Sequence, residues 1–254
     1  MASWMIHFRV ADALLRAGML GDAPDRIAAF FSLGNVAPDS GVPVSDGRGY
    51  VPDKATSHFM RRFEGVPAGE NPERCDPAAF ARTWLEPAPE GDDPVAAAFY
   101  LGYLCHLVTD NAWVRDFVYP AKVRFAHLRL VDGVETPEGV ARFYAFLKRD
   151  WYDADFLYVK KHPVPRAYAL FLGAEDVENR FLPFFPAHAF ALKRAEIEDF
   201  YRHGAAEAVE RETYPTEDAL AEFIRGVCEE IRGGFGDLFH VFCSKLTLYS
   251  QISC

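Results

Sequence analysis

The 254-residue chain lacks a long apolar run, which is the mark of a membrane-spanning helix. The nearest approach is the stretch 95–118, and it contains His106, Asp110, Arg115 and Asp116. A helix that crosses a bilayer needs ~18–20 predominantly apolar residues, so no transmembrane segment is predicted. The first residues also lack a basic region followed by an apolar one, so no signal peptide is predicted. We therefore expect a cytoplasmic protein.

Basic residues are fewer than acidic ones, and the cysteines follow no recognised spacing. The chain has 27 Lys and Arg against 37 Asp and Glu, a formal net charge of −10, which argues against stable nucleic-acid binding because phosphate contacts need clustered cations. The five cysteines follow neither a metal-binding nor a disulfide spacing, and reduced thiols are the simplest interpretation.

Alternating strand patterns, glycine-rich phosphate loops and internal repeats are also missing. Apolar residues instead recur at a helical period, and 22 Phe and 11 Tyr indicate a large aromatic core. We predict an all-α, multi-helix bundle forming one domain over residues 1–254. The expected helices lie at 4–17, 24–31, from 54 onward, 78–85, 95–118, 137–161, 188–203 and 217–248, the last interrupted at Gly233-Gly234.

The most informative stretch is 102–113, within the apolar run. His106 and Asp110 are four residues apart and lie on one helical face. An imidazole and a carboxylate stacked in this way can bind a transition metal, and a bridging carboxylate can bind two. Burial of an unpartnered carboxylate is costly, so Asp110 needs a partner. A structural hydrogen-bonded pair is the alternative interpretation.

Three further segments supply candidate ligands. His7 lies beside the apolar stripe of the first helix, Asp39 ends an apolar turn, and His58 follows a helix cap that we assign to Ser57 or Thr56. That cap would place His58 at an exposed first turn. Each residue taken singly also has an ordinary structural interpretation, as a core or surface histidine, a turn former or a cap.

Taken together, the motifs around these residues resemble those of a known protein family. Read in order, the motifs are Gly34-Asn-Val-Ala-Pro-Asp39-Ser, Lys54-x-x-Ser-His58-Phe, Gly102-Tyr-x-x-His106-x-x-x-Asp110 and Asp150-Trp-Tyr-Asp153-x-Asp155-Phe. Their order and spacing over about residues 4–160 resemble the zinc-dependent phospholipase C family, which is related to P1-type nucleases, and are most similar to its intracellular bacterial branch. Residues 165–254 are expected to be helical, and the resemblance gives no account of them.

The resemblance implies a helical fold with zinc ions in a cleft. Carried over by position, Asp39, His58, His106 and Asp110 would bind the first ion. Asp110 would bridge to a second ion, which His7 would also bind. Asp39 would be the catalytic residue that orients or deprotonates a water, since paired metal ions can activate water against a phosphodiester.

The chain also departs from the family pattern. Trp4 is not the N-terminal residue, as the tryptophan ligand of secreted relatives is, unless Met1-Ala2-Ser3 is cleaved. Asp116 stands where a third ion would need a histidine, so it is either an oxygen ligand to a further ion or no ligand. A further His-x-x-x-Glu pair is missing, and Asp150 and Asp153 are either its substitutes or a solvated acidic helix face. We therefore expect two zinc ions rather than three, with Mn or Fe as alternatives that the same ligands accept.

The predicted activity is that of a metal-dependent phosphoric-ester hydrolase, a phospholipase C-like phosphodiesterase. Its substrate would be a small phosphodiester or a phospholipid headgroup. The alternative is a non-catalytic helical module for binding or sensing, with one structural or vestigial metal. An HD-type phosphohydrolase would need an adjacent His-Asp pair, and the sequence contains none.

Overall fold

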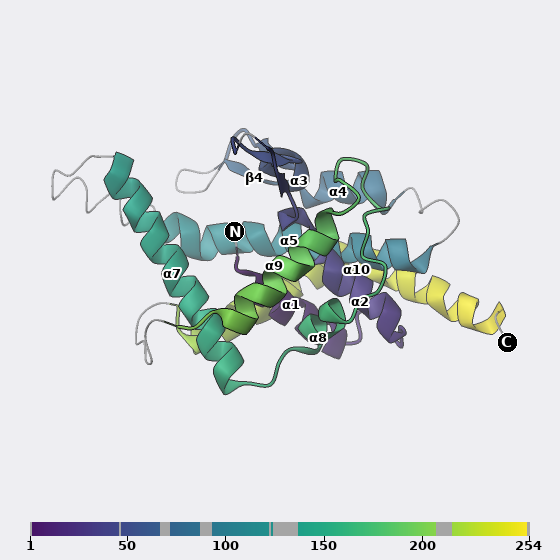
Figure 1. Ribbon diagram of the computed structural model, residues 1–254. Helices are drawn as coiled ribbons and strands as arrows, with labels where there is room; N and C mark the ends of the chain where they lie inside the picture. Colours follow the sequence, from purple (N-terminus) through teal and green to yellow (C-terminus); the bar gives the residue numbers. More distant parts are fainter. Residues whose placement is uncertain are drawn as a thin grey trace.

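Helices make up most of the structure, a computed structural model (Figure 1). It describes residues 2–45, 47–66, 72–86, 93–121, 123, 137–206 and 215–252, and at 137–144, 146 and 247–252 it describes the backbone only. The helical content confirms the predicted all-α class. The helices are α1 (Trp4–Arg16), α2 (Asp25–Gly34), α3 (Lys54–Ser57), α4 (Pro77–Trp84), α5 (Pro94–Trp113), α7 (Pro137–Lys161), α8 (Arg166–Leu172), α9 (Ala189–His203) and α10 (Glu217–Ile252).

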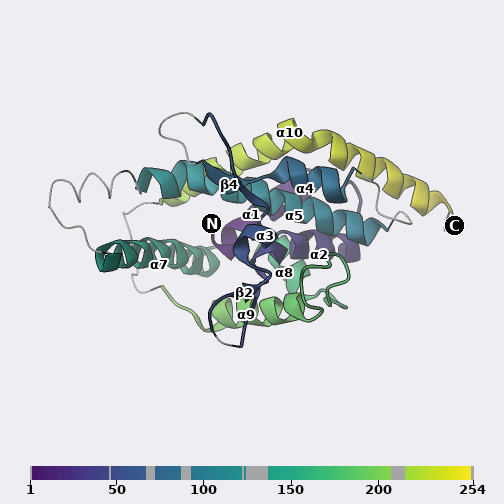
Figure 2. The same cartoon turned by 90° about the horizontal axis from the view of Figure 1, so that it is seen from above.

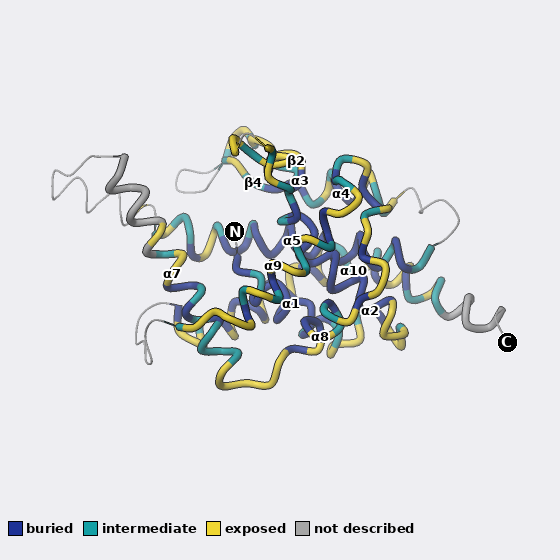
Figure 3. Tube along the Cα trace, viewed as in Figure 1, coloured by how far each residue is buried: buried dark blue, intermediate teal, exposed yellow. Residues whose placement is uncertain are grey.

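The helices pack in layers around α5. Viewed from above, α10 runs along one side, α8 and α9 lie along the other, and α1, α2 and α5 lie between them (Figure 2). The middle layer is the most deeply buried part of the chain (Figure 3). Polar side chains on the inner faces of these helices are shielded from water and must find their partners inside the protein.

Helix α5 begins at a well-defined cap. The Asp93 carboxylate accepts a hydrogen bond of 2.9 Å from the backbone N–H of Val95, and Pro94 takes the first-turn position where its missing N–H costs nothing. A π-helical segment, η2 (Val114–Val118), continues it. The helix is apolar all round and buried along most of its length, as expected of a helix at the centre of a domain.

Two glycines let α2 and α5 cross at close range. A Cβ atom on Gly34 would lie 2.1 Å from the carbonyl oxygen of Phe99, and one on Gly102 would lie 2.1 Å from that of Phe31. Both distances are far inside van der Waals contact, so only glycine fits at either position. The crossing holds the residue that follows α2, Asn35, against the His106 turn of α5.

Two short antiparallel hairpins follow α2, and the sequence analysis predicted neither. One pairs β1 (Val42–Pro43) with β2 (Tyr50–Val51), and the other pairs β3 (Met60–Arg62) with β4 (Glu73–Cys75). The expectation of a helix running on from residue 54 was therefore wrong beyond Ser57. Pairings this short leave no alternating pattern long enough to detect.

The C-terminal helix corrects a second expectation. Helix α10 runs unbroken through Gly233-Gly234, where an interruption was predicted. A Cβ at either glycine would meet nothing within 4 Å, so both lie on an open face where glycine costs helix propensity without breaking the helix. Across the described residues, no helix combines the length and apolarity that a membrane span requires.

Candidate metal centre

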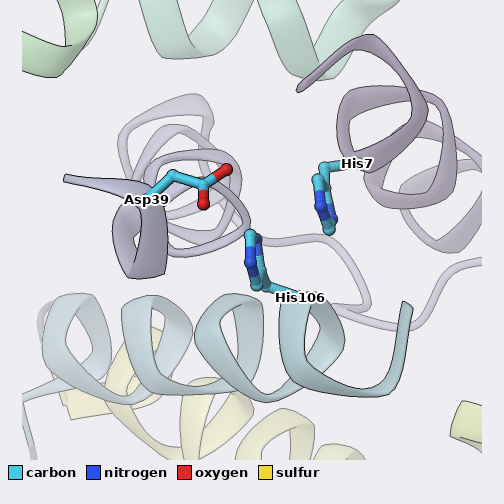
Figure 4. A group of neighbouring side chains, drawn as sticks. All are labelled: His7, Asp39 and His106. Atoms are coloured by element: carbon cyan, nitrogen blue, oxygen red, sulfur yellow. The ribbon is translucent and has the colours of Figure 1, made fainter. Parts of the chain in front are cut away.

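Five side chains from four separate segments meet at the centre of the fold. His7 comes from α1, Asp39 from the 3-10 turn η1 (Ala37–Asp39), His58 from the residue after α3, and His106 and Asp110 from α5. The three histidines and Asp110 are at most 2% exposed, and Asp39 is the most accessible member. Figure 4 shows His7, Asp39 and His106 pointing toward one another.

The local structure around His58 differs from the sequence prediction. Asp53, rather than Ser57 or Thr56, caps α3, and its carboxylate accepts from the Thr56 N–H at 2.7 Å. His58 therefore follows the C-terminus of α3 and is buried, where an exposed first turn was expected. The chain then turns sharply at Phe59, which has a positive φ of 50°, and this turn leaves the imidazole facing α5.

Three ligand atoms, His58 Nε2, His106 Nε2 and Asp110 Oδ2, have the mutual spacing of ligands to one metal ion, and Asp39 Oδ1 lies beside His58. His58 Nε2 lies 3.4 Å from His106 Nε2, 3.4 Å from Asp39 Oδ1 and 3.5 Å from Asp110 Oδ2, and His106 Nε2 lies 3.6 Å from Asp110 Oδ2. Hydrogen bonds to nitrogen are shorter, about 2.7–3.2 Å. A tetrahedron with zinc bonds of ~2.0–2.2 Å has ligand–ligand edges of ~3.3–3.6 Å. The three distances among His58, His106 and Asp110 match one face of such a shell, and Asp39 adds a fourth edge at His58.

Hydrogen-bond partners outside the cluster determine which ring nitrogen of His106 and of His58 faces the other ligand candidates. His106 Nδ1 lies 2.8 Å from the Asn35 carbonyl oxygen, which can only accept a hydrogen bond, so Nδ1 carries the proton. His58 Nδ1 lies 2.9 Å from Ser57 Oγ, whose own hydroxyl is oriented toward the Lys54 carbonyl oxygen at 3.5 Å. Both Nε2 atoms then direct lone pairs at each other and at the carboxylates, an arrangement typical of second-sphere support for metal-ligating histidines.

Such a convergence of lone pairs is repulsive unless a cation lies among them. Two Nε2 atoms and two carboxylate oxygens face one another, and protonation of a histidine or a bound metal ion at their centre would neutralise them. Burial raises the pKa of the Asp39 and Asp110 carboxyls, but other groups outweigh it and hold both pKa values below the usual range. For Asp39 these are the imidazoles of His58 and His106, and for Asp110 they are the N-terminal ammonium and then His106 and His7. The pKa of His106 is raised: burial lowers it, and the charge of Asp110 more than compensates.

His7 lies on the other side of Asp110. Its Nε2 is 3.5 Å from Asp110 Oδ1, whereas Oδ2 of the same carboxylate faces His58 and His106. The His7 ring stacks on His106 with centroids 3.9 Å apart and planes 6° apart. Burial and the His106 charge lower the pKa of His7 to about 4, so the ring is neutral at pH 7. Neither of its ring nitrogens has a hydrogen-bond partner among the described residues.

Trp4 supplies a contact that the sequence analysis did not find. Its indole N–H donates to Asp39 Oδ2 at 3.0 Å, which leaves Oδ1 directed at His58. The sequence analysis treated Trp4 only as the counterpart of the family's tryptophan metal ligand, which in secreted relatives is the N-terminal residue. The supporting roles of Asn35 and Ser57 were also missed, although both residues stand inside the motifs quoted for their neighbours. A backbone carbonyl such as that of Asn35 leaves no trace in residue type, so only the structure could reveal it.

The three additional ligand candidates lie outside this cluster. Among the described residues, the His, Cys, Asp and Glu side chains close enough to share an ion form two groups, His7 with Asp39 and His106, and His58 with His106 and Asp110. Asp116 is exposed and pairs with Arg115 at 2.8 Å. Asp150 and Asp153 are at most 7% exposed, so the expectation of a solvated acidic face was wrong, and neither joins a ligand group.

Comparisons of the chain with protein-family models, with curated proteins and with solved structures found no match. Support for a function therefore rests on the residues and their geometry.

Proposed function

We propose that the protein is a metal-dependent hydrolase of phosphoric esters, with His58, His106, Asp39 and Asp110 as the ligands of one zinc ion. The observation that carries this proposal is the triangle of His58, His106 and Asp110, whose three ligand–ligand distances of 3.4–3.6 Å fit a tetrahedral zinc shell better than they fit hydrogen bonds. Asp39 Oδ1 lies 3.4 Å from His58 Nε2 and is the proposed fourth ligand. Two imidazoles and two carboxylates suit zinc, and they also accept Mn or Fe.

A second ion would be held by His7 and by the other oxygen of Asp110. The contact of His7 Nε2 with Asp110 Oδ1, at 3.5 Å, supports this position, and so does the neutral state of the His7 ring. These two residues fill only part of a coordination shell, and Asp110 Oδ1 also accepts a hydrogen bond of 2.9 Å from the Ala2 backbone N–H. Paired ions of this kind supply Lewis acidity toward a phosphoryl oxygen and lower the pKa of a bound water.

Asp39 is the residue best placed to act on that water. It is the most accessible of the five, and its lowered pKa keeps it ionised at neutral pH. The Trp4 hydrogen bond fixes the orientation of the carboxylate, which is the requirement for a group that must meet its substrate in one geometry. No serine or cysteine nucleophile is needed by such a reaction.

The likeness of the four motifs to the zinc-dependent phospholipase C family also supports the proposal. It favours a small phosphodiester or a phospholipid headgroup as the substrate and a bundle of the phospholipase C or P1 nuclease type as the fold.

A non-catalytic protein with a structural metal is the second candidate, and one observation favours it. Four protein ligands and near-complete burial describe a closed site, whereas catalytic zinc sites keep one position open. On this hypothesis only the first ion binds, and it stabilises the middle layer of helices without turnover.

Zinc content and turnover together separate the two candidates. We expect the purified protein to hold two zinc ions per chain and to hydrolyse bis-p-nitrophenyl phosphate, and His106→Ala to abolish turnover. His203→Ala is the control, because His203 is an exposed residue of α9 that pairs with Asp199. One retained ion without turnover in the wild-type protein would favour the structural site. A chain that retains no metal would overturn both candidates.

A further inference from the structure

A group of aromatic side chains borders the metal centre on the side of its most accessible member, Asp39. Trp4 donates to the Asp39 carboxylate, Phe200 of α9 packs edge-on to Trp4 with ring centroids 5.5 Å apart, and Tyr152 of α7 packs on Phe200 at 5.3 Å. All three are partly exposed, in contrast to the fully buried aromatics of the core. We call Trp4, Tyr152 and Phe200 the aromatic rim.

Lys193 of α9 occupies this rim. Its ammonium lies 5.0 Å from the Trp4 ring centroid and 2.6 Å from a Glu196 carboxylate oxygen. The Lys193 side chain is only 11% exposed, unusually low for lysine, so the ammonium is held over the Trp4 ring instead of extending into water. Lys193, Glu196 and Phe200 are spaced by three and four residues, which places them on one face of α9.

An aromatic face with a carboxylate nearby is the environment that attracts cations, including quaternary ammonium groups of ligands. Here the protein's own ammonium already takes the cation position. A substrate that brought a second cation to the rim would meet a like charge in a partly dehydrated setting, where charge repulsion is weakly screened. A neutral or anionic group would meet no such penalty.

We infer that Lys193 is a specificity-determining residue, which directs the site toward phosphodiesters without a cationic headgroup and against choline-type esters. The inference rests on the proposed function, because it concerns the group attached to the phosphate of the substrate. That group would extend from the metal centre past Trp4. It also gives a role to α9, which lies in the part of the chain for which the sequence motifs offered no account.

Binding of two small phosphates to the zinc-loaded protein tests the inference without turnover. Glycerol 3-phosphate and phosphocholine present the same phosphate to the metal centre and differ in the charge of the attached group. Isothermal titration should show the wild-type protein binding glycerol 3-phosphate at least tenfold more tightly. Lys193→Met removes the charge but keeps an apolar chain of similar length, and it should reduce this preference to threefold or less. Lys160→Met, at an exposed position of α7, should leave it unchanged.

An equal preference in wild type and Lys193→Met would overturn the assignment, and so would a wild-type protein that binds phosphocholine as well as glycerol 3-phosphate or binds neither. The p-nitrophenyl esters of both compounds are assayed in parallel. A preference that depends on Lys193 in a protein that hydrolyses neither ester would refute the proposed hydrolase and leave the role of Lys193 as a ligand-selecting residue in place.

Discussion

At the scale of single residues, the central feature is a set of polar groups that is costly to bury without a cation. The ionised Asp39 and Asp110 lie within 3.6 Å of imidazole nitrogens whose lone pairs also face the centre. Each buried ion costs several kcal/mol in desolvation, and a bound divalent cation offsets that cost directly. The residues that form the cluster therefore favour folding most strongly when metal is present.

Substitution of single histidines should distinguish the two ion positions. We expect His58→Ala to remove the first ion and to abolish turnover, because His58 contacts three of the four first-ion ligand atoms. His7→Ala should leave one tightly bound zinc ion per chain, since the carboxylate oxygen nearest to His7 is Asp110 Oδ1, on the opposite side of that carboxylate from His58 and His106. Inductively coupled plasma mass spectrometry of the two variants measures the difference. Equal loss of metal in both would show that the cluster binds ions as one inseparable unit.

A second buried carboxylate, Asp155, should make stability depend on pH. It accepts hydrogen bonds from Ser3 Oγ at 2.7 Å and from the Tyr201 hydroxyl at 2.9 Å, yet burial raises its pKa from 3.8 to about 7. A pKa raised on folding means that the folded state binds the proton more tightly than the unfolded state does. The stabilisation from this group is therefore full at low pH and is lost as pH rises from about 4 to about 7.

Urea unfolding of wild type and Asp155→Asn in the presence of chelator measures this dependence. From pH 5 to pH 8 the free energy of unfolding of wild type should fall relative to the variant by at least ~1.4 kcal/mol, the value of one pKa unit. Asp25→Asn, at an exposed position, is the control and should show no such trend. Parallel curves for wild type and Asp155→Asn would mean that Asp155 is ionised throughout.

Sequence alone could identify the ligand candidates because residue type and spacing carry that information. His106 and Asp110 stand four apart in an apolar run, and that pattern alone predicts a shared inward face. The partners that orient the site were harder to find, since Trp4 contacts Asp39 through tertiary packing and the contact of Ser57 with the neighbouring His58 depends on the local turn. The direction in which His58 faces depends on the cap at Asp53 and the turn at Phe59, and the sequence offered several competing caps.

At the scale of elements, the site depends on how closely α2 and α5 cross. The Asn35 carbonyl that orients His106 follows α2 directly, and Gly34 and Gly102 set the distance between the two helices. The helical periods predicted the long helices, and for 137–161 they gave the bounds that the structure shows. The predicted 95–118 becomes π-helical after Trp113, and the predicted 217–248 runs unbroken to Ile252. The short hairpins were not predicted, because strands of two or three residues are set by their pairing rather than by a pattern.

Alanine at either crossing glycine should damage both fold and site. We expect Gly34→Ala and Gly102→Ala to cost ~3 kcal/mol or more, because the new Cβ would overlap a backbone oxygen at 2.1 Å and backbone cannot give way as a flexible side chain can. Zinc affinity should fall with stability, since the crossing positions Asn35. Thermal and chemical denaturation give the first quantity, and titration with a competing zinc chelator gives the second.

Gly226→Ala is the matched control for this pair. Gly226 lies within α10, and a Cβ there would meet nothing within 4 Å. The substitution should raise stability by ~0.5–1 kcal/mol, the ordinary difference in helix propensity. A crossing variant as stable as Gly226→Ala would mean that α2 and α5 can separate without loss.

At the scale of the whole molecule, segments distant in sequence enclose one centre. The ligands span residues 7 to 110, and α9, beyond residue 188, covers the accessible side through Lys193 and Phe200. The sequence predicted the helical class but could not show which side of the ligand cluster each later helix would cover. That arrangement follows from tertiary packing, which a helical period does not encode.

Because the cluster joins four segments, zinc should stabilise the molecule as a whole. At a free zinc concentration 100 times the dissociation constant, binding contributes ~2.7 kcal/mol, which corresponds to an increase in Tm of about 5–10 °C for a chain of this size. Differential scanning fluorimetry with zinc and with EDTA measures the shift. The double variant His58→Ala/His106→Ala should show none. A zinc-dependent shift of equal size in that variant would place the ion elsewhere.

X-ray absorption spectroscopy at the zinc edge tests the metal centre most directly. For the zinc-loaded protein, we predict a first shell of nitrogen and oxygen at ~2.0–2.2 Å, with the outer-shell scattering of at least two imidazoles. A protein that retains no zinc after gel filtration, or a shell that contains sulfur at ~2.3 Å, would contradict a metal centre built from His58, His106, Asp39 and Asp110.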